Sequence, residues 1–360
     1  MKPELNIQSL AELGKQLSRI ANQSIDISDE NSLELSKLIT ESVYYNSWFT
    51  PENVRFCLQA WAQALSEDNL RRWMERYRFP HPEKQKNVGL VLAGNIPMVG
   101  FHDALCVLLS GHRFTAKCAA ADNRLLPAVM KLLCAIDEQF TESISFTDGL
   151  LRHADAFIAT GSNNSGHYFD FYFRKYPHII RRNRNAVAIL TGNETPEQLQ
   201  LLGDDIFRYF GLGCRNVSKL FVPKDYDFAP LIESMSDWRW LELHHKYRNN
   251  YDYNKAIFLV NGDEFLDAGF FMLKRSASLS SPISTVFYEE YAALDEVAVK
   301  VEQAKEQIQC VVSETAVPFG QAQTPQLWDY ADGVDTMEFL GQFSAHPQKL
   351  WGGGEVMRKS

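Results

Sequence analysis

The sequence predicts an α/β protein with two domains. From residue 88 onward, segments typical of strands alternate with segments typical of helices, and this pattern indicates parallel sheets with crossover helices. The chain has 360 residues, which is more than one compact core usually holds. We therefore expect two folded domains that share a cleft.

The first domain is expected over residues 1–190. Residues 1–80 are predicted to form helices, because their apolar side chains recur every three or four positions. Pro80 and Pro82 interrupt this pattern before an apolar run at 88–92, which is predicted to be the first buried strand. The elements predicted next are a helix at 104–109, a strand at 114–116, a helix at 125–140, and strands at 144–146 and 156–159.

The second domain is expected over residues 191–335. The polar run at 246–250 is predicted to be a turn, and residues 336–360 are expected to pack back on the first domain. The alternating pattern of this half predicts strands at 186–190, 220–222, 257–260, 285–288 and 308–312, and a helix at 294–307.

Charge and composition exclude several classes of protein. The net charge is −9 and no stretch is dense in Lys and Arg, so nucleic acid is not an expected partner. No stretch reaches the roughly 18–20 apolar residues that a membrane span needs, and the N-terminal residues lack the apolar core of a secretion signal. The 6 cysteines are widely spaced without a CxxC pair, so we expect a cytoplasmic protein with reduced thiols.

Two segments of the first domain carry candidate polar residues. Asn95 follows the strand at 88–92 in a tight loop, where its amide could donate a hydrogen bond to an oxyanion or could simply complete a turn. Lys117 ends the strand at 114–116, where it is either a binding cation or a solvated strand end.

Two further segments carry candidate site residues. Gly161, Ser162 and Gly166 form a loop between a strand and a helix, in which free backbone N–H groups could face a phosphate. Cys214 stands between Gly213 and a strand, as either a nucleophile or a small buried hydrophobic residue. A nearby cation, Arg215 or Lys219, could favour its thiolate. No metal site is expected, because adjacent His244 and His245 do not converge on one ion.

In their order and spacing, these four segments resemble the aldehyde dehydrogenase superfamily, and within it the fatty acyl-CoA reductase family known from bacterial bioluminescence. The resemblance implies an aldehyde-dehydrogenase-like fold, with a Rossmann-like cofactor domain at 1–190 and a catalytic cysteine domain at 191–335. It implies that Cys214 is the nucleophile and Asn95 the oxyanion donor. It also implies that the cofactor is bound by Lys117 at the adenosine ribose and by Gly161, Ser162 and Gly166 near the diphosphate.

Departures from the superfamily pattern refine the expected reaction. Aldehyde oxidisers carry a water-activating glutamate where this chain has Arg181-Arg182-Asn183-Arg184-Asn185, so reduction of an acyl-CoA or acyl-carrier thioester is favoured. Ala120 replaces a glutamate that excludes the extra phosphate, which predicts NADPH, with NADH as the alternative. The Glu-x-Phe-Gly-Pro cofactor motif is not evident, the nearest segment being 280–284.

Several questions stay open at this level. A non-reducing acyl-binding or acyl-transfer partner subunit with the same fold is the alternative function, and a homo-oligomer is compatible with the sequence. The aromatic run that begins at Pro318 either closes the acyl pocket or is an ordinary packed tail.

Overall fold

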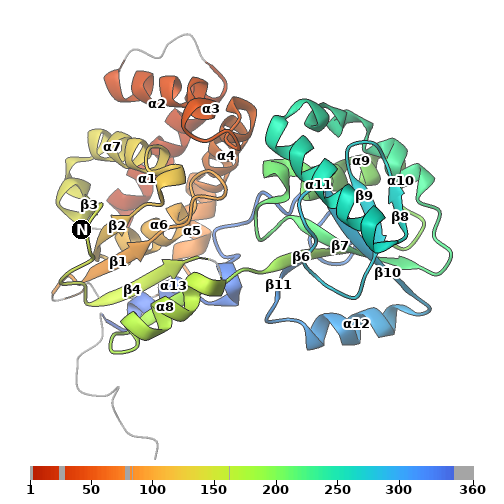
Figure 1. Ribbon diagram of the computed structural model, residues 1–360. Coiled ribbons are helices and arrows are strands. Elements are labelled where there is room, and N and C mark those ends of the chain that lie inside the picture. Colours follow the sequence, from red (N-terminus) through yellow and green to blue (C-terminus); the bar gives the residue numbers. More distant parts are fainter. Residues whose placement is uncertain (1–2, 24–28, 78–81, 83, 162, 344–360) are drawn as a thin grey trace, which may run out of the picture.

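The computed structural model describes residues 3–23, 29–77, 82, 84–161 and 163–343. Two parallel sheets lie in separate halves of the molecule, each covered by helices (Figure 1). None of the described helices is long and apolar enough to cross a membrane.

The first sheet has five parallel strands in the order β3-β2-β1-β4-β5. Its central strands are apolar because both faces are covered, and Val88 and Leu90 are fully buried. The strand order reverses between β1 and β4, and in open α/β sheets a crevice forms at the carboxyl ends of such strands. The five strands are β1 (Asn87–Val91), β2 (Arg113–Lys117), β3 (Ile144–Phe146), β4 (Ala156–Thr160) and β5 (His178–Arg181).

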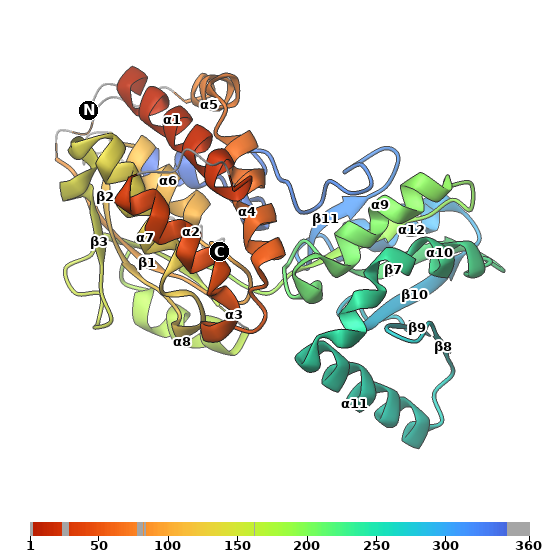
Figure 2. The same cartoon turned by 90° about the horizontal axis from the view of Figure 1, so that it is seen from above.

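Helices at the N-terminus cover one face of this sheet, and Figure 2 shows α1, α4, α6 and α7 stacked beside it. The side chain of Thr50 caps α4 and a proline occupies its first turn, which are common signals of a helix start. Every residue of α6 from Ala104 to Leu109 is buried between the sheet and the N-terminal helices. The helices of this half are α1 (Pro3–Ala21), α2 (Glu30–Thr40), α3 (Ser42–Tyr45), α4 (Pro51–Ala64), α5 (Glu67–Met74), α6 (Phe101–Leu109), α7 (Leu125–Ile136) and α8 (Asn163–Phe173).

The second sheet has six strands in the order β11-β6-β7-β10-β9-β8, and only β8 runs antiparallel to its neighbour. Its strands are β6 (Asn185–Ile189), β7 (Val217–Pro223), β8 (Phe265–Asp267), β9 (Met272–Arg275), β10 (Thr285–Tyr291) and β11 (Ile308–Val312). Its helices are α9 (Pro196–Phe207), α10 (Ala229–Ser234), α11 (His245–Asn261) and α12 (Leu294–Gln303). The expected alternation of strands and helices, with parallel pairing, is therefore confirmed in both halves.

Several predicted elements are wrong in type or length. The strand expected at 257–260 and the turn expected at 246–250 both lie inside α11, which ends at Gly262 with a φ of 68°. The apolar run at 257–260 suggested a buried strand. Only Phe258 of this run is buried, whereas Val260 is 87% exposed on the outer side of the helix. The helix expected at 125–140 ends at Ile136, the helix expected at 294–307 ends at Gln303, and β5, β8 and β9 were not predicted.

After β11 the chain returns from the second half to the first. Residues 313–335 form a long loop that contains a short turn of 3-10 helix, Ala331–Gly333, and leads into α13 (Thr336–Gly341). Met337 and Leu340 of α13 are fully buried in the core of the first half, and residues 344–360 lie outside the described part of the chain. This returning segment reaches the crevice of the first sheet.

Candidate active site

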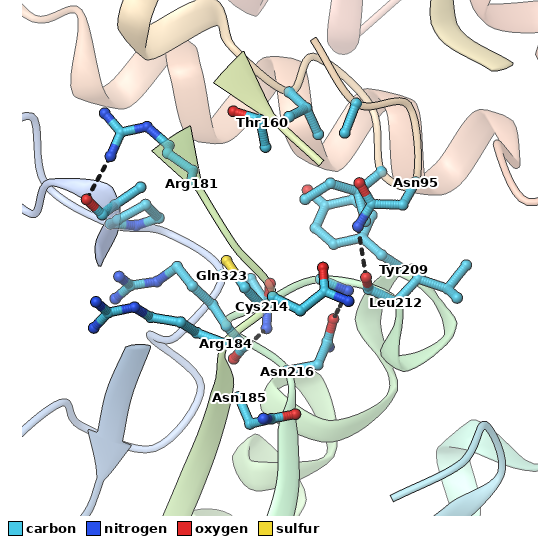
Figure 3. Close-up of a pocket in the computed structure, with 18 of the residues that line it drawn as sticks. Asn95, Thr160, Arg181, Arg184, Asn185, Tyr209, Leu212, Cys214, Asn216 and Gln323 are labelled. Carbon is cyan, nitrogen blue, oxygen red and sulfur yellow. Dashed lines mark hydrogen bonds between the residues drawn. The ribbon is translucent and has the colours of Figure 1, made fainter. Parts of the chain in front are cut away.

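A cavity of about 1210 Å³ lies between the two halves (Figure 3). Its walls come from α4, the β1–α6 loop, the end of β4, residues 181–185, the loop before β7, residues 280–283 and the segment that returns after β11. Asn95, Gly161 and Cys214 all line it, so the fold brings together three residues that are separated by up to 119 positions.

The loop that carries Asn95 is closely packed. A side chain at Gly94 would place its Cβ 2.9 Å from the backbone nitrogen of Asp122, so this position requires glycine. The buried Asp122 carboxylate accepts a hydrogen bond of 2.9 Å from the Met98 N–H, and burial raises the pKa of Asp122 to about 6. The amide of Asn95 donates to the Leu212 carbonyl at 2.7 Å, which ties this loop to the cysteine loop.

The cysteine loop turns sharply before Cys214. Tyr209, Phe210 and Gly211 have φ values of 53°, 60° and 75°, so three successive residues are left-handed and the chain reverses after α9. Asn216 holds this turn, since its Oδ1 accepts from the Gly213 N–H at 2.8 Å. Its Nδ2 donates to the carbonyls of Arg208 at 2.8 Å and of Asp205 and Ile206 at 3.2 Å.

The thiol of Cys214 is in a partly dry environment. Burial raises the pKa of Cys214, the positive charge of Arg215 opposes this rise, and the negative charge of Asp332 adds to it. The suggestion that Lys219 favours the thiolate is wrong. The side chain of Lys219 is fully buried in β7, and its ammonium pairs with the Glu289 carboxylate at 2.7 Å.

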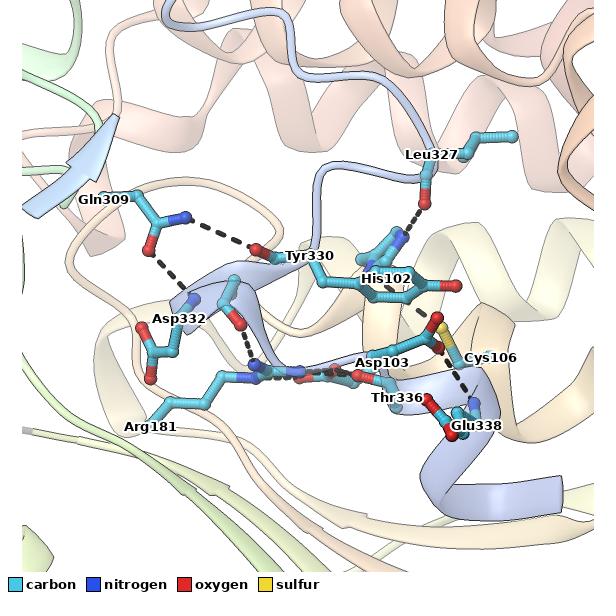
Figure 4. A network of polar contacts seen from close by, with 12 residues as sticks. His102, Asp103, Cys106, Arg181, Gln309, Leu327, Tyr330, Asp332, Thr336 and Glu338 are labelled. Atoms are coloured by element: carbon cyan, nitrogen blue, oxygen red, sulfur yellow. Dashed lines mark hydrogen bonds and ion pairs between the residues drawn. The ribbon is translucent and has the colours of Figure 1, made fainter. Parts of the chain in front are cut away.

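The stretch 181–185, which begins at the last residue of β5, forms ion pairs with distant parts of the chain (Figure 4). Arg181 is buried and pairs with Asp103 of α6 at 2.6 Å; it also donates to the Ala331 carbonyl at 2.6 Å. Arg184 pairs with Asp332 at 3.2 Å. The stretch itself has no carboxylate, but the fold brings Asp103 and Asp332 to the same cavity from other segments.

The predicted cofactor residues are placed unequally. Lys117 ends β2 and pairs in register with Val91 of β1, so it lies at the same sheet edge as the Asn95 loop, although it does not line the cavity. The Gly161 N–H donates to the Arg181 carbonyl at 3.3 Å. Gly166 lies inside α8 and not in the expected loop, beside the side chain of Arg182. Ser162 lies outside the described residues.

Sequence reasoning gave no individual role to Asp332, Asn216 or Gln323, although Gln323 and Asp332 lie in the segment that was expected either to close the acyl pocket or to pack as a tail. Gln323 donates to the Arg215 carbonyl at 3.0 Å and lines the cavity, so the segment that begins at Pro318 does contribute to the pocket. The Asp332-Gly333 pair was a visible turn signal, but nothing local tells that this turn lines the same cavity as Cys214. No group of three or more His, Cys, Asp or Glu side chains placed to hold a metal ion occurs among the described residues.

Solved structures of aldehyde dehydrogenases share this architecture. Aldehyde dehydrogenase 21 from Physcomitrella patens aligns with 94% of this chain and 84% of its own, at a TM-score of 0.63 and 10% identity. The fold is that of an aldehyde dehydrogenase. Indole-3-acetaldehyde dehydrogenase from P. syringae, in complex with NAD+, aligns over 87% of this chain and 72% of its own, with a TM-score of 0.61 and 10% identity.

A third solved structure of an aldehyde dehydrogenase has the same fold. The NAD-dependent enzyme from Sinorhizobium meliloti covers 87% of this chain and 72% of its own, at a TM-score of 0.59 and 10% identity. No protein-family model and no curated sequence matches the chain. The expected two-domain fold with a Rossmann-like sheet is therefore confirmed.

Proposed function

We propose that this chain is a nicotinamide-dependent oxidoreductase that reduces an acyl thioester to an aldehyde through an acyl intermediate on Cys214. One observation carries the proposal: the Cys214 thiol and the Asn95 amide share a cavity at the crevice of a Rossmann-like sheet. The same fold occurs in an indole-3-acetaldehyde dehydrogenase in complex with NAD+ and in an NAD-dependent aldehyde dehydrogenase.

The first sheet fits a dinucleotide. The carboxyl ends of β1 and β4 flank its switch point, and Thr160 and Gly161 line the cavity beside them. Lys117 stands half-exposed at the end of neighbouring β2 and Ala120 is exposed, and we propose that Lys117 would contact the adenosine end and that Ala120 would admit an additional phosphate. When bound, NADPH or NADH would supply a hydride to the acyl carbon.

The residues of the chain would carry out the remaining steps. The Cys214 thiolate attacks the thioester carbonyl, and the Asn95 amide with the Cys214 backbone N–H holds the oxyanion. The amide can do so because its nitrogen has two N–H groups and only one is used by the Leu212 carbonyl. The thiol of coenzyme A or of a carrier protein departs. Collapse of the thiohemiacetal then breaks the bond to Cys214 and releases the aldehyde.

The proposed direction of the reaction rests on Arg181. This residue belongs to the stretch 181–185, which stands where aldehyde oxidisers carry their water-activating glutamate, and its guanidinium is buried against Asp103. A cation at this place does not deprotonate water, so the acyl-cysteine is protected from hydrolysis until it is reduced. We expect free aldehydes to be oxidised to acids only slowly.

A non-reducing acyl-transfer subunit is the second candidate. Residues Ser280, Ser281, Pro282 and Ile283 line the cavity where the second cofactor motif would lie, and they offer no carboxylate to the nicotinamide ribose. Such a protein would be acylated on Cys214 but would consume no reduced cofactor.

One experiment separates the two candidates. Purified protein is mixed with acyl-CoA of several chain lengths and with NADPH or NADH, while cofactor absorbance and intact mass are followed. A reductase consumes cofactor and forms aldehyde, and Cys214→Ala abolishes both the consumption and the acyl adduct. Cys310→Ala is the matched control in β11. Adduct formation without cofactor consumption would favour the transfer subunit, and activity retained in Cys214→Ala would exclude both.

A further inference from the structure

The cavity that contains Cys214 also contains a carboxylate that the mechanism above does not use. Asp332 lines this cavity, and its side chain is only 10% exposed. The other carboxylates in the described wall are Asp103, which is taken up by Arg181, and Glu306, which belongs to an exposed residue. Asp103 and Asp332 are the two buried carboxylates of the described wall. Of these two, Asp332 has the more distant ion-pair partner.

The position of Asp332 is set by its neighbours (Figure 4). Its backbone has a φ of 59°, a left-handed conformation that is unfavourable for a residue with a Cβ. The Asp332 N–H donates to the side chain of Gln309 at 3.0 Å, and the preceding carbonyl of Ala331 accepts from Arg181 at 2.6 Å. Strained backbone that is held in this way often occurs where a functional side chain must be aimed.

The charges around Asp332 suit proton transfer. Burial raises the pKa of Asp332, and the positive charges of Arg181 and Arg184 oppose the rise. Arg184 is paired with Asp332 at 3.2 Å. The negative charge of Asp332 in turn raises the pKa of Cys214, and both residues line the same cavity.

We propose that Asp332 is the acid of the acylation step, which gives its proton to the thiol that leaves the substrate. The Cys214 sulfur forms a bond to the carbonyl carbon, and the bond from this carbon to the leaving sulfur breaks. The Asp332 carboxyl gives its proton to the leaving sulfur and recovers one from the solvent, which has received the proton of the Cys214 thiol, so no oxidant or reductant is required. This inference rests on the proposed thioester chemistry.

Asp332 could act only through its charge, as the partner of Arg184. In that case its removal should speed the reactions of Cys214, whereas the proposal predicts slower acylation by acyl-CoA. Removing its charge lowers the pKa of Cys214, because that charge raises it. Alkylation of Cys214 by iodoacetamide needs the thiolate but no proton donor, so Asp332→Asn should alkylate at least as fast as the wild type. Acylation by acyl-CoA also needs a proton for the leaving thiolate.

The test therefore compares two thioesters of the same acyl group in single-turnover acylation followed by intact mass. With acyl-CoA, Asp332→Asn should acylate about 10²-fold more slowly than the wild type. With the S-phenyl thioester, whose aromatic thiolate leaves without protonation, the variant should lose much less. Asp332→Glu, which keeps a carboxylate, should recover part of the rate with acyl-CoA. Asp329→Asn, an exposed aspartate of the same loop, is the matched control.

The outcomes are distinct. Unchanged acylation by acyl-CoA in Asp332→Asn overturns the proposal, and so does an equal loss with both thioesters, which would mean that Asp332 only shapes the loop. A rate of Cys214 alkylation in the variant that equals or exceeds that of the wild type shows that the cavity is folded. If the wild type is acylated by neither thioester, the proposed function itself fails, and this inference fails with it.

Discussion

Asn95 connects the two loops that carry the proposed chemistry. Its amide donates to the Leu212 carbonyl, two residues before Cys214, while its own loop is pinned by the buried Asp122 carboxylate. The residue is exposed to the cavity, so the second N–H of its amide is accessible to a substrate. Asn95 can therefore both place the cysteine loop and stabilise an oxyanion.

We predict that Asn95→Ala lowers turnover by about 10² to 10³, because one oxyanion donor is lost. Steady-state kinetics with acyl-CoA measure the effect. The rate of Cys214 alkylation is the control, since a displaced cysteine loop would change it. Normal turnover in Asn95→Ala would identify Asn95 as a turn residue only.

Cofactor selectivity also belongs to the residue scale. Ala120 is exposed at the position where a glutamate would repel the additional phosphate of NADPH, and Arg124 is exposed nearby. Asp122 could have replaced that glutamate, but its buried carboxylate is bonded to the Met98 N–H. The fold thus keeps this acid away from the position that we propose for the ribose.

We predict that NADPH is used at least as well as NADH, and that Lys117→Ala weakens NADPH more than NADH, because the ammonium can pair with the phosphate. The measurement is kcat/KM for both cofactors with one acyl-CoA. Lys131→Ala, an exposed lysine of α7 that pairs with Glu34, is the matched control. A tenfold preference for NADH, about 1.4 kcal/mol, would contradict the argument.

At the scale of elements, the turn between α9 and β7 determines where Cys214 lies. Three left-handed residues make this turn, and Asn216 satisfies four backbone groups around it. An aspartate has the same shape but no N–H groups, so it would face three carbonyl oxygens with an acceptor.

We therefore expect Asn216→Asp to lower turnover at least tenfold and to destabilise the protein by about 1–3 kcal/mol, because buried carbonyls lose their donor. Turnover, Cys214 alkylation and denaturant unfolding measure these effects. Asn193→Asp, in an exposed turn, should change none of them. Wild-type alkylation and stability in Asn216→Asp would show that the turn forms without the hydrogen bonds of Asn216.

The end of α9 is also linked to the segment that returns after β11. The Asp205 carboxylate is fully buried and accepts from the N–H groups of Gly320 at 2.7 Å and Ala322 at 2.8 Å. Burial raises the pKa of Asp205 to about 7, with these two hydrogen bonds opposing the rise. The folded state therefore holds a proton that the unfolded state, with an aspartate pKa of about 3.9, releases more easily.

This linkage gives a pH prediction with a definite sign. The stabilisation that Asp205 contributes is complete below about pH 4 and is lost as the pH rises towards 7, by up to about 1.4 kcal/mol per unit. We expect the difference in unfolding free energy between the wild type and Asp205→Asn to fall across this window. A flat or rising difference for Asp205→Asn would contradict the prediction.

At the scale of the whole molecule, one buried ion pair joins three segments. Arg181 ends β5, Asp103 lies in α6, and Thr336 begins the helix that returns from the second half. Arg181 donates to Asp103 and to the Thr336 hydroxyl at 2.7 Å, so it anchors the returning segment on the first core. Burial by itself would raise the pKa of the Asp103 carboxyl. The positive charge and the hydrogen bonds of Arg181 outweigh this effect, so the pKa of Asp103 is held below its usual range.

We predict that Asp103→Leu or Arg181→Met alone destabilises the protein by about 3–5 kcal/mol, because one charge is left buried without its partner. The double variant should recover much of this loss, since both charges are gone. Denaturant unfolding gives the energies, and hydrogen exchange at residues 331–341 localises the effect. If each single variant is as stable as the double one, the ion pair does not hold this segment.

The sequence by itself determined most of the strand and helix pattern of the first half, β5 excepted, and the order of its motifs. The short apolar strands followed by polar turns are local features, and parallel strands with crossover helices follow from their alternation. In α11 the local signal failed, because four successive apolar residues fit a strand or a helix equally well and only packing selects one.

Only the tertiary structure decided which groups meet in the cavity. Sequence spacing placed no carboxylate near Cys214, yet Asp332 lies in the same cavity wall. Lys219 and its ion-pair partner Glu289 are 70 residues apart along the chain. Gly166 has a plausible loop position in the sequence but lies in a helix. The physical reason is that ion pairs and cavity walls form between segments distant along the chain, and local propensities do not encode how those segments pack.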